Sequence, residues 1–357
     1  MDSARTYRLM EIHGSLFYLL SENLEKKLAV LRGKMRILKE THPSGIPYRN
    51  PLSVGDYVLA TQDFQSKDNH LVILEVLPRK QVLIRSTPTE IHLLGSNLDY
   101  AVCTVSFVEP DIRTGFIDRF LISCLKENIK PILFFTKCDR INKDNPTHKE
   151  YISYSFYYKK IVENVFFDNL LEIENYKDFL FFLKSSEKIS GFKEFRESIK
   201  KGTILLVGQS GTGKSTLLNL ILGTPVQKTS PVSKTTKKGK HTTTTSTLFA
   251  ISKELSIIDS PGIKEWGLNH LTKKEIIETY PEWKEILGNC KFKNCSHIPN
   301  IEGCAIQEAI SNGSLPIWRK ENLDSILNSI DYYEKIRPGD YKKSTGRFHN
   351  TFYNYDN

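Results

Sequence analysis

Residues 203–222 read TILLVGQSGTGKSTLLNLIL and decide the fold class. An apolar run ends at Gly208, GQSGTGKS follows over residues 208–215, and a helix-forming apolar segment comes next. Glycines in such a turn let backbone N–H groups converge on phosphate oxygens at a helix N-terminus, where Lys214 adds a cation and Ser215 a hydroxyl for Mg²⁺. The stretch therefore predicts a strand, a phosphate-binding P-loop and a helix. An accidental glycine-rich turn is the alternative.

A second apolar strand, residues 255–258, is closed by Asp259-Ser-Pro-Gly262. Beside a P-loop, Asp259 is placed to hold the Mg²⁺ shell through water, and Gly262 to offer its N–H to the γ-phosphate. Alone, this tetrapeptide is an ordinary turn. The expected phosphate contacts also include Gly208, Gln209, Ser210, Gly211, Thr212, Gly213, Lys214, Ser215 and Thr216.

A third strand, residues 131–135, ends in Thr136-Lys137-Cys138-Asp139, which fits a base-reading loop. The Asp139 carboxylate accepts two hydrogen bonds from guanine N1 and N2, a donor pair that adenine lacks. Leaving this carboxylate unpaired costs free energy, so the loop favours GTP over ATP. Lys137 lays its alkyl stem along the base. A solvated Lys-Asp loop is the alternative.

The region 96–270 alternates apolar strands with amphipathic helices, which predicts a mostly parallel sheet with covering helices. The base-reading loop precedes the P-loop, which precedes Asp259, whereas ordinary GTPases run the other way. The expected strands are 100–108, 131–135, 179–183, 203–207 and 255–258, and the expected helices are 117–128 and 214–222, with a helical, aromatic insert at 141–178.

The flanking regions predict further domains. Residues 1–30 are expected to form a helical extension, and residues 31–95 an OB-like β-barrel with strands at 34–38, 56–61, 71–77 and 81–85. Residues 271–335 predict a helical unit with helices at 273–287, 305–311 and 318–330. Basic and aromatic residues alternate in the tail, 336–357, where RNA-base stacking competes with a frayed terminus as the interpretation.

Three cysteines and a histidine cluster in the helical unit, in the order Cys290, Cys295, His297, Cys304. Three thiolates and an imidazole can close a tetrahedral Zn²⁺ site, and with no position left open the role of the metal is structural. The alternatives are a core histidine with free thiols, or a redox pair. The other cysteines, at 103, 124 and 138, are expected to be buried thiols.

The composition points to a folded protein with a polyanionic partner. The chain has 50 Lys plus Arg against 41 Asp plus Glu, a net charge of +9, although a solvated basic surface is the alternative. No apolar run is long enough for a membrane span, and no signal peptide is evident at the start. We expect a cytoplasmic monomer.

These motifs together resemble the circularly permuted GTPases, and specifically the RsgA (YjeQ) family of ribosome small-subunit-dependent GTPases. The resemblance covers about residues 33–330 and rests on residues 208–219, Gly239-Lys-His-Thr-Thr-Thr244, residues 259–267 and the cysteine–histidine cluster. It implies that Ser185 and Ser186 contact guanine O6 through backbone N–H groups. Thr136 stands where the family has Asn, and Lys240 where it has Arg.

The segment between the P-loop and Asp259 is rich in lysine and is expected to be a switch. In this interpretation Thr242 or Thr243 binds Mg²⁺, and the lysines contact RNA phosphates. A solvated loop is the alternative. Ile263 follows the D-x-x-G glycine, where Ras-like enzymes place a water-orienting Gln. The resemblance transfers a catalytic histidine to His241, although a surface histidine without a partner is the alternative.

The complete interpretation is a multidomain α/β protein. It comprises an N-terminal OB-like β-barrel, a circularly permuted P-loop GTPase domain and a C-terminal helical zinc-binding domain. The resemblance implies hydrolysis of GTP to GDP and phosphate in late maturation of the small ribosomal subunit, with ribosomal RNA stimulating turnover. A P-loop ATPase or kinase, and a non-catalytic GTP-sensing RNA-binding module, are the alternatives.

Overall fold

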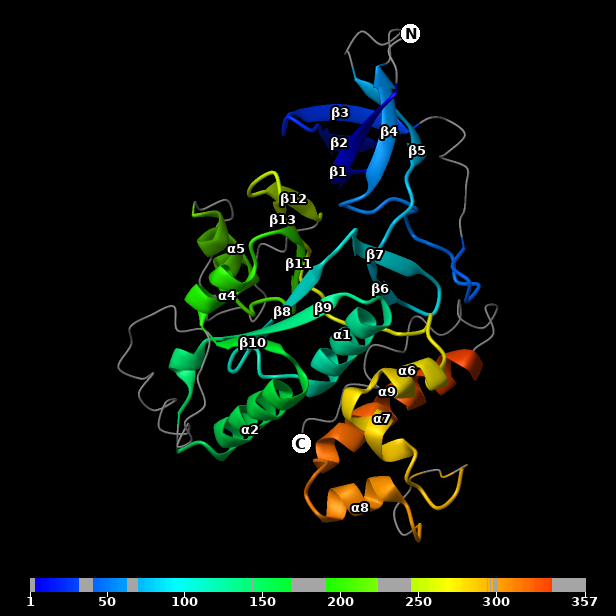
Figure 1. Cartoon of the computed structure of the whole chain (residues 1–357), viewed down its shortest axis with the longest axis vertical. Helices are drawn as coiled ribbons and strands as arrows, with labels where there is room; N and C mark the ends of the chain where they lie inside the picture. Colours follow the sequence, from blue (N-terminus) through cyan, green and yellow to red (C-terminus); the bar gives the residue numbers. More distant parts are fainter. Residues whose placement is uncertain are drawn as a thin grey trace, which may run out of the picture. The chain divides into compact units, whose positions relative to one another are not determined.

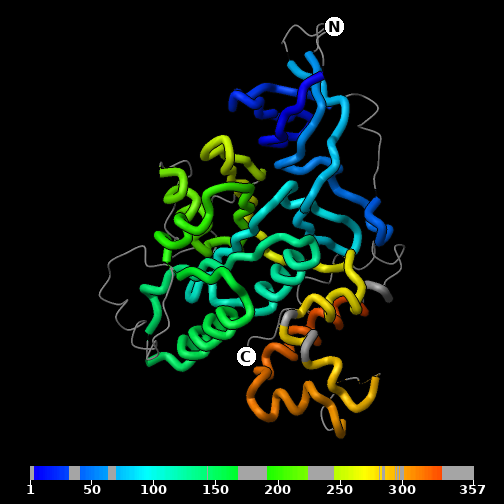
Figure 2. The backbone as a smooth tube through the Cα atoms, viewed as in Figure 1, coloured from blue at the N-terminus to red at the C-terminus, as the bar shows by residue number. Residues whose placement is uncertain are grey.

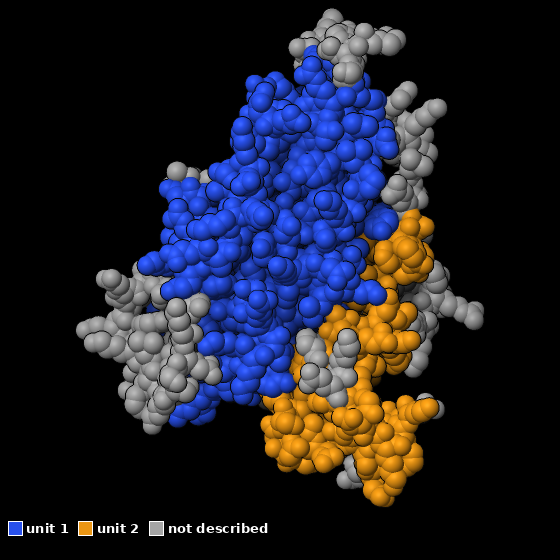
Figure 3. Space-filling model, viewed as in Figure 1, with its two compact units in different colours: residues 1–40, 48–85, 92–266 blue, residues 41–47, 86–91, 267–357 orange. Residues whose placement is uncertain are grey.

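The computed structural model describes residues 4–31, 41–62, 70–142, 144–167, 191–223, 245–293, 295, 297 and 301–335. The chain divides into two compact units (Figure 3). Unit 1 contains residues 1–40, 48–85 and 92–266, and unit 2 contains residues 41–47, 86–91 and 267–357. Every helix among the described residues is too short or too polar to cross a membrane.

Five strands of unit 1 close into an OB-like barrel, as predicted. The strand order is β1-β2-β3-β5-β4, and β4 returns to pair with β1, so that no edge stays open. Only the β3–β5 pairing is parallel. The barrel strands are β1 (Arg5–His13), β2 (Leu16–Leu20), β3 (Lys26–Leu31), β4 (Tyr57–Gln62) and β5 (Leu71–Val76), which form the blue end of the chain in Figure 1.

The first 30 residues are not a helical extension, and that prediction is wrong. They supply three of the five barrel strands, with Leu9, Phe17 and Leu19 in the barrel core. The period of two is hidden in the sequence because outward positions such as Leu16 are also apolar, and because a bulge between Leu9 and Glu11 breaks the alternation in β1. The predicted strand 34–38 lies outside the described residues.

Residues 81–85 are a strand, but their place in the barrel was predicted wrongly. They belong to β6 (Val82–Ser86), which pairs with β7 (Ile91–Ser96) in a separate two-stranded sheet. The barrel is already closed by β1 to β5, so it has no edge left for β6 to join.

The second half of unit 1 is the predicted parallel sheet. The strand order is β10-β9-β8-β11-β13, all parallel, with β12 antiparallel at the end. The elements are β8 (Tyr100–Ser106), α1 (Thr114–Lys126), β9 (Lys130–Thr136), α2 (Pro146–Ile161), β10 (Asn164–Phe167), α4 (Phe192–Ser198), β11 (Gly202–Gly208), α5 (Lys214–Leu222), β12 (Thr247–Ala250) and β13 (Leu255–Asp259). The insert expected to be helical therefore also carries a strand, β10, while the predicted strand 179–183 lies outside the described residues.

Both faces of this sheet are covered. On one face Phe134 of β9 packs with Phe195 of α4 and Leu218 of α5. On the other, Phe135 stacks on Phe107 and α1 lies against β8 and β9. Because both faces are buried, the strand sequences are mostly apolar instead of alternating, as expected for a parallel sheet.

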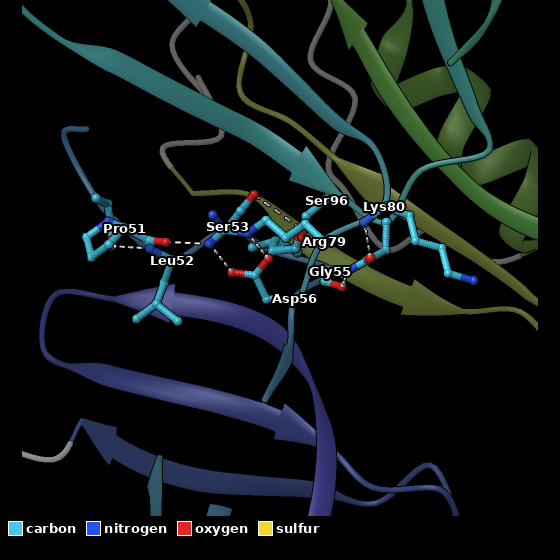
Figure 4. Close-up of polar contacts among 11 residues, drawn as sticks. Pro51, Leu52, Ser53, Gly55, Asp56, Arg79, Lys80 and Ser96 are labelled. Atoms are coloured by element: carbon cyan, nitrogen blue, oxygen red, sulfur yellow. Dashed lines mark hydrogen bonds and ion pairs between the residues drawn. The ribbon is translucent and has the colours of Figure 1, made fainter. Parts of the chain in front are cut away.

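The barrel and the parallel sheet are joined within unit 1. Strand β1 pairs with β12, so the two sheets are continuous. At the turn before β4, the buried Asp56 carboxylate accepts two hydrogen bonds from Arg79, each 2.7 Å long. Figure 4 shows the two residues among their neighbours. Gly55 has a φ of +97°, and a Cβ there would lie 2.4 Å from the Ser96 carbonyl oxygen. Only glycine fits this close approach.

Unit 2 is helical, as predicted. Its helices are α6 (Lys273–Thr279), α7 (Pro281–Leu287), α8 (Ala305–Ser311) and α9 (Ile317–Lys335), which Figure 2 shows in yellow to red. The helix predicted over 273–287 is two helices, because Pro281 has no N–H to continue α6 and instead occupies the first turn of α7. Thr272 caps α6 in a capping box with Glu275.

Candidate functional site

Three loops meet at one edge of the parallel sheet. Strands β9, β11 and β13 are parallel and lie within four neighbouring positions of the sheet, so their carboxyl ends share this edge. They lead into residues 136–140, 208–213 and 259–263, which are the predicted base-reading loop, P-loop and D-x-x-G loop. Ligands of open α/β sheets bind in this position.

The P-loop has the backbone that phosphate binding requires. Gly211 and Gly213 have φ values of +85° and +84°, a region that favours glycine. At Gly208 a Cβ would lie 2.3 Å from the Thr104 hydroxyl, so a side chain is excluded there too. Helix α5 begins at Lys214 without a side-chain cap, so its first N–H groups have no side-chain acceptor, as an anion-binding helix N-terminus requires.

Lys214 and Asp259 form a buried ion pair at the centre of the site. The Lys214 ammonium donates to Asp259 Oδ1 over 2.8 Å, and both side chains are buried. A phosphate that takes over the ammonium releases the carboxylate for the water shell of Mg²⁺. The pair thus sets one cation and one carboxylate side by side at the sheet edge, where an anion and a divalent cation would each find a partner.

The D-x-x-G loop is fastened to the P-loop by backbone contacts. The Ile263 N–H donates to the Gly208 carbonyl over 3.0 Å, and a Cβ on Gly262 would lie 3.4 Å from the Ser210 backbone. The Ser260 hydroxyl donates to the Leu206 carbonyl over 2.7 Å. The Ile263 side chain is buried and has no hydrogen-bonding group.

The base-reading loop is tied to the P-loop by Thr136. Its buried hydroxyl donates to the Thr212 carbonyl over 2.8 Å. Lys137 has a φ of 58°, and its ammonium donates to the Glu109 carbonyl. Burial, with Arg140 nearby, lowers the pKa of Lys137. Asp139 lies in the 3₁₀ turn Cys138–Arg140, which follows β9 at the same edge of the sheet.

Replacing Thr136 by Val tests this tie. Valine keeps the shape of the side chain but leaves the Thr212 carbonyl without this donor, so we expect a loss of about 1–2 kcal/mol in the free energy of unfolding. Urea unfolding measures it. The exposed Thr147 makes no side-chain hydrogen bond to a described residue, so Thr147→Val is the control. An unchanged Thr136→Val midpoint contradicts the assignment.

Sequence reasoning missed Thr104 of β8, which supports the P-loop from beneath. Its hydroxyl lies 2.8 Å from the Thr212 hydroxyl, and Thr212 in turn donates to the Gln209 carbonyl. Thr104, Gln209 and Thr212 also line a hollow beside the start of α1. The only sequence signal was a polar residue inside an otherwise apolar strand.

Several predicted site residues lie outside the described residues. They are Ser185 and Ser186, His241, Thr242 and Thr243, and the lysines of the predicted switch. The structure brings the remaining predicted residues, from Thr136 to Gly262, to the single sheet edge described above.

The cysteine–histidine cluster is assembled in unit 2. The ligand atoms of Cys290, Cys295, His297 and Cys304 all lie within 4.8 Å of one another. His297 Nδ1 is 3.7 Å from Cys290 Sγ and 3.5 Å from Cys304 Sγ. Tetrahedral zinc, with bonds of about 2.3 Å to sulfur and about 2.0 Å to nitrogen, separates such atoms by about 3.5 Å. The residues present therefore fit the metal.

The surroundings of His297 support metal binding. Its ring meets Trp283 edge-on, with centroids 6.2 Å apart, and its carbonyl accepts a hydrogen bond from Gln307. Burial, with Lys320 nearby, lowers the pKa of His297, which favours the neutral imidazole that binds metals. No disulfide links the described cysteines.

Comparison with known proteins gives a consistent result. The sequence model of the RsgA GTPase family matches residues 76–269. A Flavobacterium psychrophilum protein named small ribosomal subunit biogenesis GTPase RsgA is 31% identical, with 84% of this chain and 86% of that protein covered. An Azobacteroides pseudotrichonymphae protein of the same name is 32% identical over 89% of this chain and 94% of its own.

Solved structures show the same fold. The crystal structure of YjeQ from Thermotoga maritima has a TM-score of 0.62 at 22% identity and covers 94% of this chain and 100% of its own. YloQ, described as a circularly permuted GTPase, has a TM-score of 0.59 at 21% identity, with coverage of 94% and 98%. The order of loops along the chain agrees with that permutation.

Proposed function

The chain belongs to the RsgA GTPase family and is a GTP hydrolase. On that premise we propose that it acts in late maturation of the small ribosomal subunit, and that binding to the subunit stimulates its GTP hydrolysis. The observation that carries the proposal is the meeting of P-loop, Asp259 and base-reading loop at one sheet edge, in permuted order. The relatives carry small-subunit biogenesis in their names.

In this proposal the P-loop binds the phosphates of GTP. The uncapped N–H groups of α5 and the Lys214 ammonium hold the β- and γ-phosphates. Ser215, Asp259 and either Thr242 or Thr243 would hold Mg²⁺, which neutralises phosphate charge when bound. Gly262 offers its N–H to the γ-phosphate.

Base selection is assigned to Asp139, with Ser185 and Ser186 as further base contacts. Asp139→Asn replaces one acceptor oxygen by a donor, so one of the two hydrogen bonds to guanine is lost. We expect GTP affinity to fall by about 10- to 100-fold, which corresponds to about 1–3 kcal/mol. Fluorescent GTP titration measures it, with the exposed Asp144→Asn as control. Equal GTP and ATP affinity in the unaltered protein contradicts the assignment.

His241 is proposed to orient the attacking water. The buried Ile263 side chain cannot do so, and a positioned imidazole typically contributes about 10²-fold. We expect His241→Ala to keep GTP affinity and to lose about 100-fold of the subunit-stimulated rate in single-turnover phosphate release. His148→Ala, at a partly exposed position of α2 outside the sheet edge, is the control. Full stimulated turnover in His241→Ala would give the role to another group.

The test of the function is phosphate release from GTP and from ATP, with and without purified small ribosomal subunits. The proposal expects slow release from GTP, a large increase with the subunit, and little release from ATP. Comparable release from ATP would indicate a general P-loop ATPase. GTP binding without any stimulated turnover would indicate a GTP-sensing RNA-binding module.

We propose further that Cys290, Cys295, His297 and Cys304 hold one structural Zn²⁺. With four protein ligands, no coordination position is left for a substrate. Because ribosomal subunits mature in the cytoplasm, the proposal places the protein there, acting as a monomer on one subunit.

A further inference from the structure

The β6–β7 hairpin and the segment beside it bring together two arginines, Arg85 and Arg49, that neither the barrel nor the nucleotide site uses. The Thr87 N–H donates to the Glu90 carbonyl and closes the turn, a register that sets Arg85 of β6 opposite His92 of β7. The Ile91 N–H donates to the Pro47 carbonyl, so the segment leading to Arg49 runs beside the hairpin.

Arg85 lacks the partners that a half-buried guanidinium needs. Its Nε atom is buried without a hydrogen-bond partner, and its side chain makes no hydrogen bond or ion pair with any described residue. The exposed Glu265 attracts it without forming an ion pair. By contrast, Arg79 is paired through two nitrogens to Asp56 (Figure 4).

A second arginine adds to the positive charge. Arg49 is exposed, lies close enough to repel Arg85, and also makes no side-chain hydrogen bond within the described part of the chain. Burial and both arginines lower the pKa of His92 to about 4, so its ring is neutral at pH 7 and the charge belongs to the arginines. Two neighbouring guanidinium groups with no ion-pair partner among the described residues cost free energy that a bound anion recovers.

We propose that Arg49 and Arg85 form a binding site for a phosphodiester group of RNA, an inference that rests on the proposed action on the small ribosomal subunit. The planar guanidinium matches phosphate oxygens in a bidentate manner. The exposure of Arg49 leaves the site open to a large ligand, and the net charge of +9 favours a polyanion over an isolated acidic side chain. The site supplements the nucleotide-binding edge and takes no part in hydrolysis.

The test uses full-length Arg49→Gln, Arg85→Gln and the double variant. Arg196→Gln, an exposed arginine on α4, is the control. Binding to purified small subunits and to a ribosomal RNA fragment is measured at several KCl concentrations. We expect Arg85→Gln to weaken RNA binding about tenfold. Each variant should also reduce the slope of log affinity against log salt by about 0.7–0.9.

Two readouts separate a binding defect from a folding defect. Basal GTP hydrolysis should be unchanged in all variants. The double variant should melt no lower than the unaltered protein without RNA, because removing two repelling charges relieves strain on the hairpin. A double variant that binds subunits and RNA with unaltered affinity and salt slope overturns the inference and leaves the proposed function standing.

The remaining outcomes are equally distinct. If the unaltered protein fails to bind subunits but the double variant still loses RNA-fragment binding, the proposed function fails and the site stands. Inorganic phosphate provides the other arm. If phosphate raises the melting temperature of the unaltered protein only, while the variants keep full RNA binding, the site takes a free anion and the RNA assignment is overturned. If polyglutamate binds the unaltered protein through these arginines while the variants keep full RNA binding, the RNA assignment is overturned and the site takes an acidic protein.

Discussion

Lys214→Met is expected to lower GTP hydrolysis by about 10³-fold at saturating GTP. The Lys214 ammonium is buried beside Asp259, at the edge of the sheet where the P-loop and the D-x-x-G loop meet. A cation in such a water-poor position stabilises the charge that develops on the transferred phosphoryl oxygens more strongly than it would in water. Methionine keeps the length of the side chain and removes that charge.

The same substitution also lowers the stability of the fold, and the experiment must separate this effect from the loss of hydrolysis. Lys214→Met leaves the fully buried Asp259 carboxylate without its partner, and an uncompensated buried charge costs about 3–5 kcal/mol. Adding Asp259→Asn removes the orphaned charge, so we expect the double variant to unfold near the unaltered protein and to stay inactive.

Single-turnover phosphate release and urea unfolding are measured on the same samples. Lys253→Met, at an exposed position in the β12–β13 turn, is the matched control and should change neither quantity. If Lys214→Met hydrolyses GTP within tenfold of the unaltered rate, the lysine does not stabilise the transition state, and the α5 N-terminus must carry that role.

The backbone of the P-loop was predictable because it is set by local chemistry. Gly211 and Gly213 have positive φ angles that favour glycine, and Lys214 follows at the start of the helix. One short stretch of sequence therefore contains the complete P-loop. The permuted order was visible for the same reason: each loop could be recognised alone and placed by its residue number.

What the sequence hid depends on contacts between distant segments. Residues 5–13 form strand β1 because they pair with β2, β4 and β12, and the local sequence does not indicate these three partners. Gly55 is required by the Ser96 carbonyl, 41 positions along the chain, and Thr104 acts through Thr212 of the P-loop. In each case the reason for the residue lies in a neighbour that only the fold supplies.

Removing the proposed zinc is expected to unfold unit 2 while leaving unit 1 able to bind GTP. Helices α6, α7 and α8 have seven residues each, which is too short for stability in isolation. The cluster closes the chain from Cys290 to Cys304, immediately before α8. Structural zinc sites supply about 10–16 kcal/mol of apparent binding free energy at pH 7, more than such a small helical unit gains by packing.

Cys304→Ser is the direct test, because Cys304 is buried and its sulfur faces His297 Nδ1 at 3.5 Å. We expect zinc content to fall from about one equivalent to near zero, and limited proteolysis to cleave residues 267–335 while fluorescent GTP still binds. Cys124→Ala, a buried cysteine of α1 outside the cluster, should keep the metal. A zinc-free protein whose residues 267–335 resist protease would show that packing around Trp283 and Arg319 holds the helices without a metal.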